Sequence, residues 1–205
     1  MHKISLDLHS IILFLVIFAL LIIAGYLSNL EQLRKIKKVA LDLGLNFKMD
    51  YNNHWRLTGN YKNSFVEIFT ELIGNTKSRK GFTYHYTIIL MKAIQPLPFE
   101  MKITKRGMIE NIFKKFFTTG EIKTGDAKFD RSFIISGDSP EEIIKLCLNP
   151  VVQEAIYELM HAPGFSILSK GIYYDESGIN TNINFYKWAL PRMSMAVDTI
   201  YGKEK

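Results

Sequence analysis

Three aspartates, Asp126, Asp130 and Asp138, are the residues of this sequence best suited to chemistry. Carboxylate oxygens are the ligands that hard cations such as Mg²⁺ and Ca²⁺ prefer, so the three could hold a metal for hydrolysis. However, residues 129–136 alternate like a strand, and a strand would hold Asp126 and Asp130 more than about 10 Å apart. We therefore expect structural roles: Asp126 as a turn residue, Asp130 as the ion-pair partner of a lysine or arginine, and Asp138 before a helix cap.

Other patterns typical of catalysis or metal binding are incomplete. The five histidines lack the spacing of a metal-binding helix, and the single cysteine, Cys147, lies in an apolar segment where a thiol is usually buried. Glu67 and Glu71 would lie about 13 Å apart on a strand, beyond the separation of paired catalytic carboxylates. Ser166 lacks the closing glycine of a nucleophile elbow, and residues 74–81 lack the Gly-Lys-Ser/Thr of a phosphate loop. The sequence predicts no catalytic residue, no cofactor and no metal, with a membrane-tethered metal-dependent hydrolase as the alternative.

The strongest candidate for an interaction surface is a predicted helix over residues 107–119. Its phenylalanines fall on one side and basic residues surround them, a pattern that suits an anionic membrane interface or a protein partner. The alternative is that these phenylalanines belong to the core. A second basic cluster lies nearer the N-terminus. Together the two clusters give the predicted membrane-surface or partner contacts: Arg34, Lys35, Lys37, Lys38, Phe113, Lys114, Lys115, Phe116 and Phe117.

A long apolar run near the N-terminus predicts where such a surface would act. No charged residue lies between Asp7 and Glu31, and about 20 apolar residues in a helix cross a bilayer. Only Lys3 is basic before the run, which is longer than the core of a signal peptide, and no small-residue cleavage site follows it, so we expect an uncleaved anchor. Residues 183–201 contain three charges and a proline, so a second span is not expected. The predicted membrane-spanning residues include Ile11, Phe14, Ile17, Leu20, Ile23 and Leu27.

The charges on either side of this span predict its orientation. Basic residues follow the span at positions 34–38, whereas only Lys3 and the terminal amine are positive before it. The positive-inside rule therefore places the N-terminus outside and the C-terminal domain in the cytoplasm. The lone cysteine agrees, because it cannot form an intramolecular disulfide. A domain on the outer, envelope side of the membrane is the alternative.

The overall charge does not predict a nucleic-acid partner. The formal net charge is +6, and the residues just after the span supply much of it. An anionic inner leaflet attracts such a cluster without any nucleic acid. The sequence also lacks the aromatic-basic, zinc-finger and helix-turn-helix patterns of nucleic-acid readers.

Periodicity predicts the elements that must position these residues. Apolar residues recur every three or four positions over residues 31–43, which indicates an amphipathic helix that either continues the span or breaks near Ser28. Residues 55–58 and 65–72 flank a turn and predict a hairpin. Residues 82–91 alternate like a strand of an antiparallel sheet, and helices are predicted toward the C-terminus.

These elements predict an α+β fold in which one transmembrane helix precedes a single soluble domain. The domain would have a mainly antiparallel sheet with helices on one face. The predicted divisions are a tail at residues 1–9, a transmembrane helix at 10–29, an amphipathic connecting helix at 30–44 and the soluble domain at 45–205.

The run Gly125-Asp126-x-x-Phe129-Asp130-x-x-Phe133 resembles a strand of uncharacterised bacterial membrane-anchored proteins that have one N-terminal span and one soluble domain. The Gly/Tyr-rich segment near residues 164–174 is similar too. The resemblance implies a small anchored module and brings no activity with it. We therefore expect a single-pass, membrane-anchored binding or scaffold domain, whose partners are the lipid bilayer and a protein or an anionic lipid.

Overall fold

The computed structural model describes residues 8–50, 54–74, 83–107 and 120–202. It begins with a single helix, α1 (Leu8–Leu43), of 36 residues, which is about 54 Å long at 1.5 Å per residue. The helix runs through Ser28 and Asn29 without a break and ends at Leu43, and the next residue, Gly44, has a φ of 67° that suits glycine. Within the described chain, α1 is the one helix long and apolar enough to cross a membrane.

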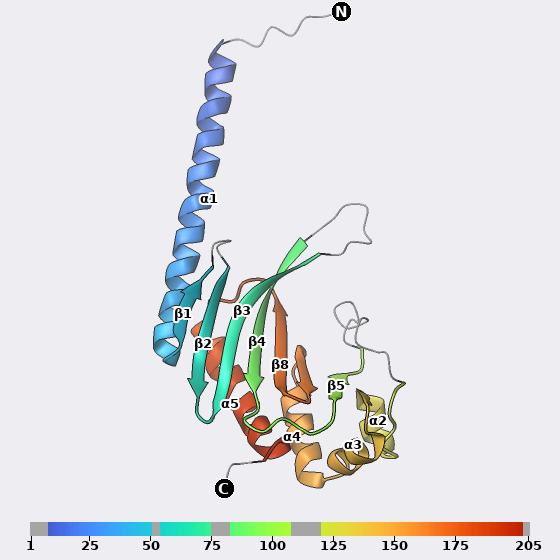
Figure 1. Ribbon diagram of the computed structural model, residues 1–205. Helices are drawn as coiled ribbons and strands as arrows, with labels where there is room; N and C mark the ends of the chain where they lie inside the picture. The colour runs from blue at the N-terminus through green and yellow to red at the C-terminus, as the bar shows by residue number, and fades with distance from the viewer. Residues whose placement is uncertain (1–7, 51–53, 75–82, 108–119, 203–205) are drawn as a thin grey trace, which may run out of the picture.

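All strands join one antiparallel sheet in the order β1-β2-β3-β4-β8-β7-β5-β6 (Figure 1). The predicted α+β class, with one long apolar helix before an antiparallel sheet, is therefore confirmed. The strands are β1 (Asn46–Met49), β2 (Trp55–Tyr61), β3 (Ser64–Gly74), β4 (Thr83–Lys92), β5 (Met101–Lys105), β6 (Phe133–Gly137), β7 (Phe165–Leu168) and β8 (Gly171–Ser177).

Local hairpins form the half of the sheet next to α1. β2 and β3 pair through a tight turn in which Lys62 has a φ of 52°, as the predicted hairpin requires. β3 then pairs with the whole length of β4, from Phe65 opposite Lys92 to Gly74 opposite Thr83. The other half is assembled from distant segments, since β8 lies between β4 and β7, and β5 between β7 and β6.

The shorter helices pack on one face of the sheet, as predicted. These are α2 (Ala127–Ser132), α3 (Pro140–Cys147), α4 (Pro150–Met160) and α5 (Ile183–Ile200). In Figure 1, α4 and α5 lie behind the sheet. Ring contacts fix α5 to this face, because Phe185 lies 5.3 Å from Tyr174 of β8 and Trp188 lies 5.9 Å from Phe165 of β7. Pro191 lies inside α5, and Leu190 beside it is fully buried, so α5 is a core helix.

The predicted strand over residues 129–136 is wrong in its first half. Residues up to Ser132 belong to α2, and the strand begins only at Phe133. The reason is a helix cap: the Asp126 side chain accepts hydrogen bonds from the backbone N–H groups of Lys128 at 2.9 Å and Phe129 at 3.1 Å. The spacing of Phe129 and Phe133 fits one face of a helical turn as well as one face of a strand.

Candidate membrane-facing site

The two halves of α1 have opposite surroundings. No residue in the most apolar stretch of the helix is buried in the protein. Toward its C-terminal end, Ile36, Val39 and Ala40 are 0%, 2% and 3% exposed because they pack into the domain core. One continuous helix therefore carries both an exposed apolar surface and a docked surface.

The basic residues after the span lie on the docked half of α1. Arg34, Lys35, Lys37 and Lys38 are exposed. Lys35 pairs with Glu31 at 2.8 Å, and hydrogen bonding to Lys35, reinforced by its charge, lowers the pKa of Glu31. Lys37 lies 5.3 Å from the ring of Phe47 in β1. The other predicted contacts (Phe113, Lys114, Lys115, Phe116 and Phe117) lie outside the described residues, as does their predicted helix over residues 107–119.

One end of the sheet points the same way as the apolar half of α1. The chain turns back at Gly44, so β1 runs beside α1 toward the apolar half (Figure 1). From Phe47, which is level with Lys37, two further residues of strand bring Met49 about 7 Å closer to the span. Met49 pairs with Trp55, and the β2–β3 register then places Leu72 about 7 Å further in the same direction. Met49 and Leu72 are 48% and 47% exposed.

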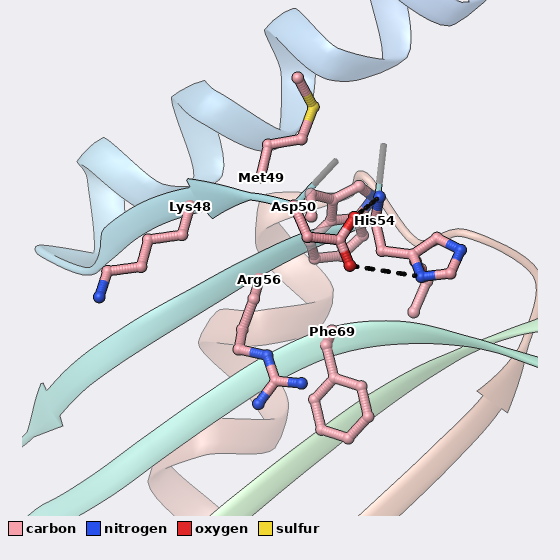
Figure 2. A pocket seen from close by; sticks show the side chains of 8 residues that line it. Lys48, Met49, Asp50, His54, Arg56 and Phe69 are labelled. Atoms are coloured by element: carbon pink, nitrogen blue, oxygen red, sulfur yellow. Dashed lines mark hydrogen bonds and ion pairs between the residues drawn. The ribbon is translucent and has the colours of Figure 1, made fainter. Parts of the chain in front are cut away.

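A pocket opens near this end of the sheet (Figure 2). Its volume is about 400 Å³, and its lining comes from three neighbouring strands. Asp50 accepts a hydrogen bond from the backbone N–H of His54 at 2.9 Å, and its other oxygen lies 3.7 Å from His54 Nδ1. The lining residues are Lys48, Met49, Asp50, His54, Trp55, Arg56, Phe69 and Thr70.

A three-residue ion-pair group adjoins the pocket through Arg56, which is one of its lining residues. Arg56 lies 4.9 Å from the Phe69 ring and pairs with Glu67 at 3.0 Å, and Lys92 pairs with the other Glu67 oxygen at 3.1 Å. Burial alone would raise the pKa of Glu67, but hydrogen bonds from Lys92 and Arg56 outweigh it and hold the pKa below its ordinary value. Glu67 is thus salt-bridged, as expected, and Glu71 is exposed.

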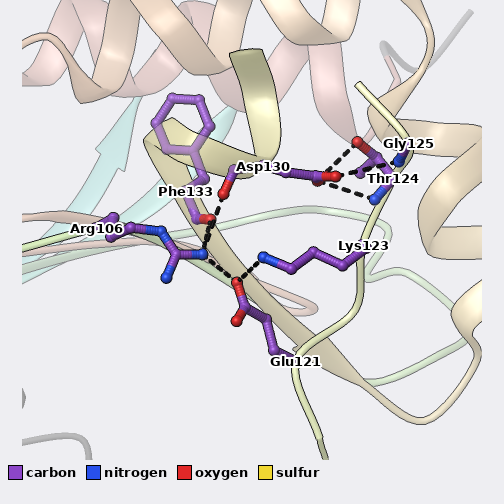
Figure 3. Close-up of polar contacts among 7 residues, drawn as sticks. All are labelled: Arg106, Glu121, Lys123, Thr124, Gly125, Asp130 and Phe133. Atoms are coloured by element: carbon purple, nitrogen blue, oxygen red, sulfur yellow. Dashed lines mark hydrogen bonds and ion pairs between the residues drawn. The ribbon is translucent and has the colours of Figure 1, made fainter. Parts of the chain in front are cut away.

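The predicted acidic cluster is used for local structure (Figure 3). Asp130 accepts hydrogen bonds from the backbone N–H and side-chain hydroxyl of Thr124, both at 2.9 Å, and from the Gly125 N–H at 3.2 Å. Among the described residues these hydrogen bonds are the main contacts of the Asp130 carboxylate, and the charge of Lys123 also acts on it, adding to them in lowering its pKa. Asp138 accepts the Glu100 N–H at 3.0 Å. Among the described residues, no group of three His, Cys, Asp or Glu side chains is arranged to hold a metal ion.

Arg106 joins the start of the loop after β5 to the elements that follow it. Its guanidinium bonds to the Glu121 carboxylate and donates to the backbone oxygens of Asp130 at 3.1 Å and Phe133 at 3.2 Å (Figure 3). Lys123 also pairs with Glu121 at 2.8 Å. Hydrogen bonds from Lys123 and Arg106 lower the pKa of Glu121. This network is structural.

A buried polar group on the other face of the sheet is one that sequence reasoning missed. Lys102 is only 8% exposed, and its face of the sheet also carries Ser166 and Asp175. Burial lowers the pKa of Lys102 to about 8 and raises the pKa of Asp175 to about 6, although each charge partly offsets the other. Burial also raises the pKa of Tyr173, and Asp175 adds to that effect. In β5, Lys102 alternates with apolar residues, so from sequence it reads as an exposed strand residue.

Cys147 and Ser166 are both buried, at 0% and 1% exposed. Burial raises the pKa of the Cys147 thiol to about 12, so it stays protonated at neutral pH. The expectation that the Cys147 thiol is buried is therefore confirmed.

Comparison with known proteins adds a likeness of fold. No protein-family model matches this sequence, and no curated protein matches it. Among solved structures, the crystal structure of the mycobacterial trehalose monomycolate transport factor A, TtfA, is similar with a TM-score of 0.50. The two share 11% sequence identity over 81% of this chain and 92% of that chain. At this identity the likeness concerns the fold, and it is a fold carried by a transport factor.

Proposed function

We propose that this chain is a single-pass membrane protein whose α+β domain is a non-catalytic binding module held against the membrane surface. The continuity of α1 carries this proposal. An exposed apolar half suited to lipid and a half buried in the domain belong to one helix, so the domain follows the anchor rigidly. The similar fold of a protein named as a transport factor supports an accessory, partner-binding role over a catalytic one.

Alkaline carbonate extraction of membranes tests the anchor. The full chain should stay in the membrane pellet. Leu20→Arg combined with Ile23→Arg should release it, because each arginine near the bilayer centre opposes insertion by about 2.5–3.5 kcal/mol. Leu41→Arg is the matched control, since Leu41 is an 80% exposed leucine on the docked half of the same helix. Release of the unmodified chain by carbonate would contradict the proposal.

We also propose that the domain faces the cytoplasm, because the basic residues follow the span. A reporter that fluoresces only in the cytoplasm, fused after Lys205, should be bright. A stable but dark fusion would place the domain in the envelope instead. The partners would then be envelope components, while the binding role would stand.

A further inference from the structure

We propose that the membrane-facing end of the sheet, defined here by Lys48, Met49, His54, Arg56 and Leu72, lies in the headgroup layer of an anionic bilayer and contacts lipid phosphates there. This inference rests on the proposed membrane anchoring and names the lipid surface as a partner of one particular site. It uses described residues that lie on strands, far in sequence from the anchor.

The geometry follows from the lengths of the elements. Twenty residues from Ile11 end at Leu30, so the hydrocarbon edge falls about there. Met49, about 7 Å above the level of Lys37, is then level with about Leu33, or roughly 5 Å from that edge. The headgroup layer is about 5–7 Å thick on each side, so it includes Met49, and Leu72 reaches the hydrocarbon edge.

The exposed side chains at this level suit an interface. Met49 and Leu72 are large apolar residues with about half of their surface exposed. An exposed apolar side chain gains free energy when it enters the boundary between headgroups and acyl chains. Their positions at the span-facing end of β1 and β3 make the bilayer the nearest surface that could cover them.

The charges at the same level favour an anionic surface. Lys48 and Arg56 line the pocket, and the four basic residues of the docked half of α1 lie within two turns of one another. Asp50 opposes an anion, but it is held by the backbone and side chain of His54. Basic groups near the surface of a bilayer with anionic lipid are attracted to it over about one Debye length.

A fluorescent probe can measure the depth of this end in the full chain. Leu72→Cys and Asn63→Cys would each be labelled with an environment-sensitive dye and placed in nanodiscs of phosphatidylcholine with 30% phosphatidylglycerol. Asn63 lies in the turn at the other end of β3, about 26–30 Å away. The native Cys147 is buried with a raised pKa, so unmodified protein gives the labelling background.

Lipids with a spin label near the top of the acyl chain should quench the dye at position 72 at least threefold more than the dye at position 63. Equal and weak quenching at both positions, in a chain that resists carbonate, would overturn this inference and leave the anchoring intact. Release by carbonate would instead overturn the anchoring on which it rests.

Varying the charge of the lipid provides a second test of the proposed phosphate contact. In the Leu72→Cys background, Lys48→Glu should reduce quenching at least twofold with 30% phosphatidylglycerol, and should change it little in pure phosphatidylcholine. Lys62→Glu, at the far end, is the matched charge control and should have no effect. If quenching in the Lys48→Glu variant does not depend on lipid charge, the proposed phosphate contact is wrong.

Discussion

The Asp130 carboxylate shows how a residue suited to metal binding can serve local structure instead. It accepts three hydrogen bonds from Thr124 and Gly125, so Asp130→Ala leaves these donors without their acceptor. We expect a loss of about 1–2 kcal/mol in the free energy of unfolding, measured by denaturant titration in detergent. Glu141→Ala, at an exposed position in α3, is the control and should change stability by less than about 0.5 kcal/mol.

The same carboxylate predicts a pH dependence. Although burial opposes ionisation, hydrogen bonds from Thr124 and Gly125 lower the pKa of Asp130 in the folded protein. Its contribution is therefore complete above the unfolded pKa of about 3.9 and is lost as the pH falls through the lower folded value. The Asp130→Ala variant should lose less stability than the unmodified protein when the pH is lowered from 5 to 3. An equal loss would show that other groups cause the acid sensitivity.

Asp175 predicts the opposite pH dependence from Asp130, because burial raises the pKa of Asp175 to about 6. The folded protein binds this proton more tightly than the unfolded chain, so stability from this group increases as the pH falls from about 7 toward 4. Lys102→Met removes the cation that lowers the Asp175 pKa. The pKa of Asp175 should then rise above 6, so its stabilising protonation should begin at a higher pH, and at pH 8 the variant should lose about 1–3 kcal/mol of unfolding free energy.

Carbon-13 NMR of the Asp175 carboxyl group measures that titration directly. Lys105→Met is the matched control from the same strand, since the Lys105 ammonium donates to the backbone oxygen of His161 at 3.1 Å. It should leave the Asp175 midpoint in place. A midpoint near the unfolded value of 3.9 in the unmodified protein would contradict the assigned burial effect.

At the scale of elements, the close pairing of β4 with β8 depends on Gly171. An added Cβ would lie 2.1 Å from the Met91 carbonyl oxygen, and the φ of 146° is unfavourable for other residues. Gly171→Ala should cost about 2–4 kcal/mol of unfolding free energy, because the strands must separate to make room. Gly120→Ala is the control, since among the described residues no atom beyond its chain neighbours lies within 4 Å of its Cβ position. Equal stability of the two variants would contradict this tight approach.

The elements also show how far sequence reasoning reaches. The β2–β3 hairpin and the alternation of β4 depend on neighbouring residues, so they were predictable. The placement of β8 between β4 and β7 depends on pairing between distant segments, which no local pattern encodes. The same limit explains why Lys102 was missed: its face of β5 is buried only because of how β6 and β7 pair with it. The start of α2 was missed because the Asp126 cap outweighed an alternating pattern.

For the whole molecule, the continuity of α1 sets the distance between membrane and domain. The sequence left open whether this helix breaks near Ser28, and the structure shows no break there. Helices transmit displacement along their axis, so the height of the sheet above the bilayer should depend on the number of residues between the span and Ile36. This dependence separates a rigid strut from a flexible tether.

A seven-residue helix-forming insert between Leu30 and Glu31 tests that dependence. It should raise the domain by about 10.5 Å and rotate it by only about 20°, because seven residues are nearly two full turns. Energy transfer from a dye at Asn63→Cys to acceptor lipids should report an increase of about 10 Å in height, with the unfolding free energy of the domain unchanged. Quenching at position 72 should disappear, since Leu72 would then lie beyond the headgroup layer. A glycine-serine insert of the same length is the control, and it should broaden the distribution of distances without a uniform shift. If both inserts give the same distribution, α1 acts as a flexible tether in the membrane.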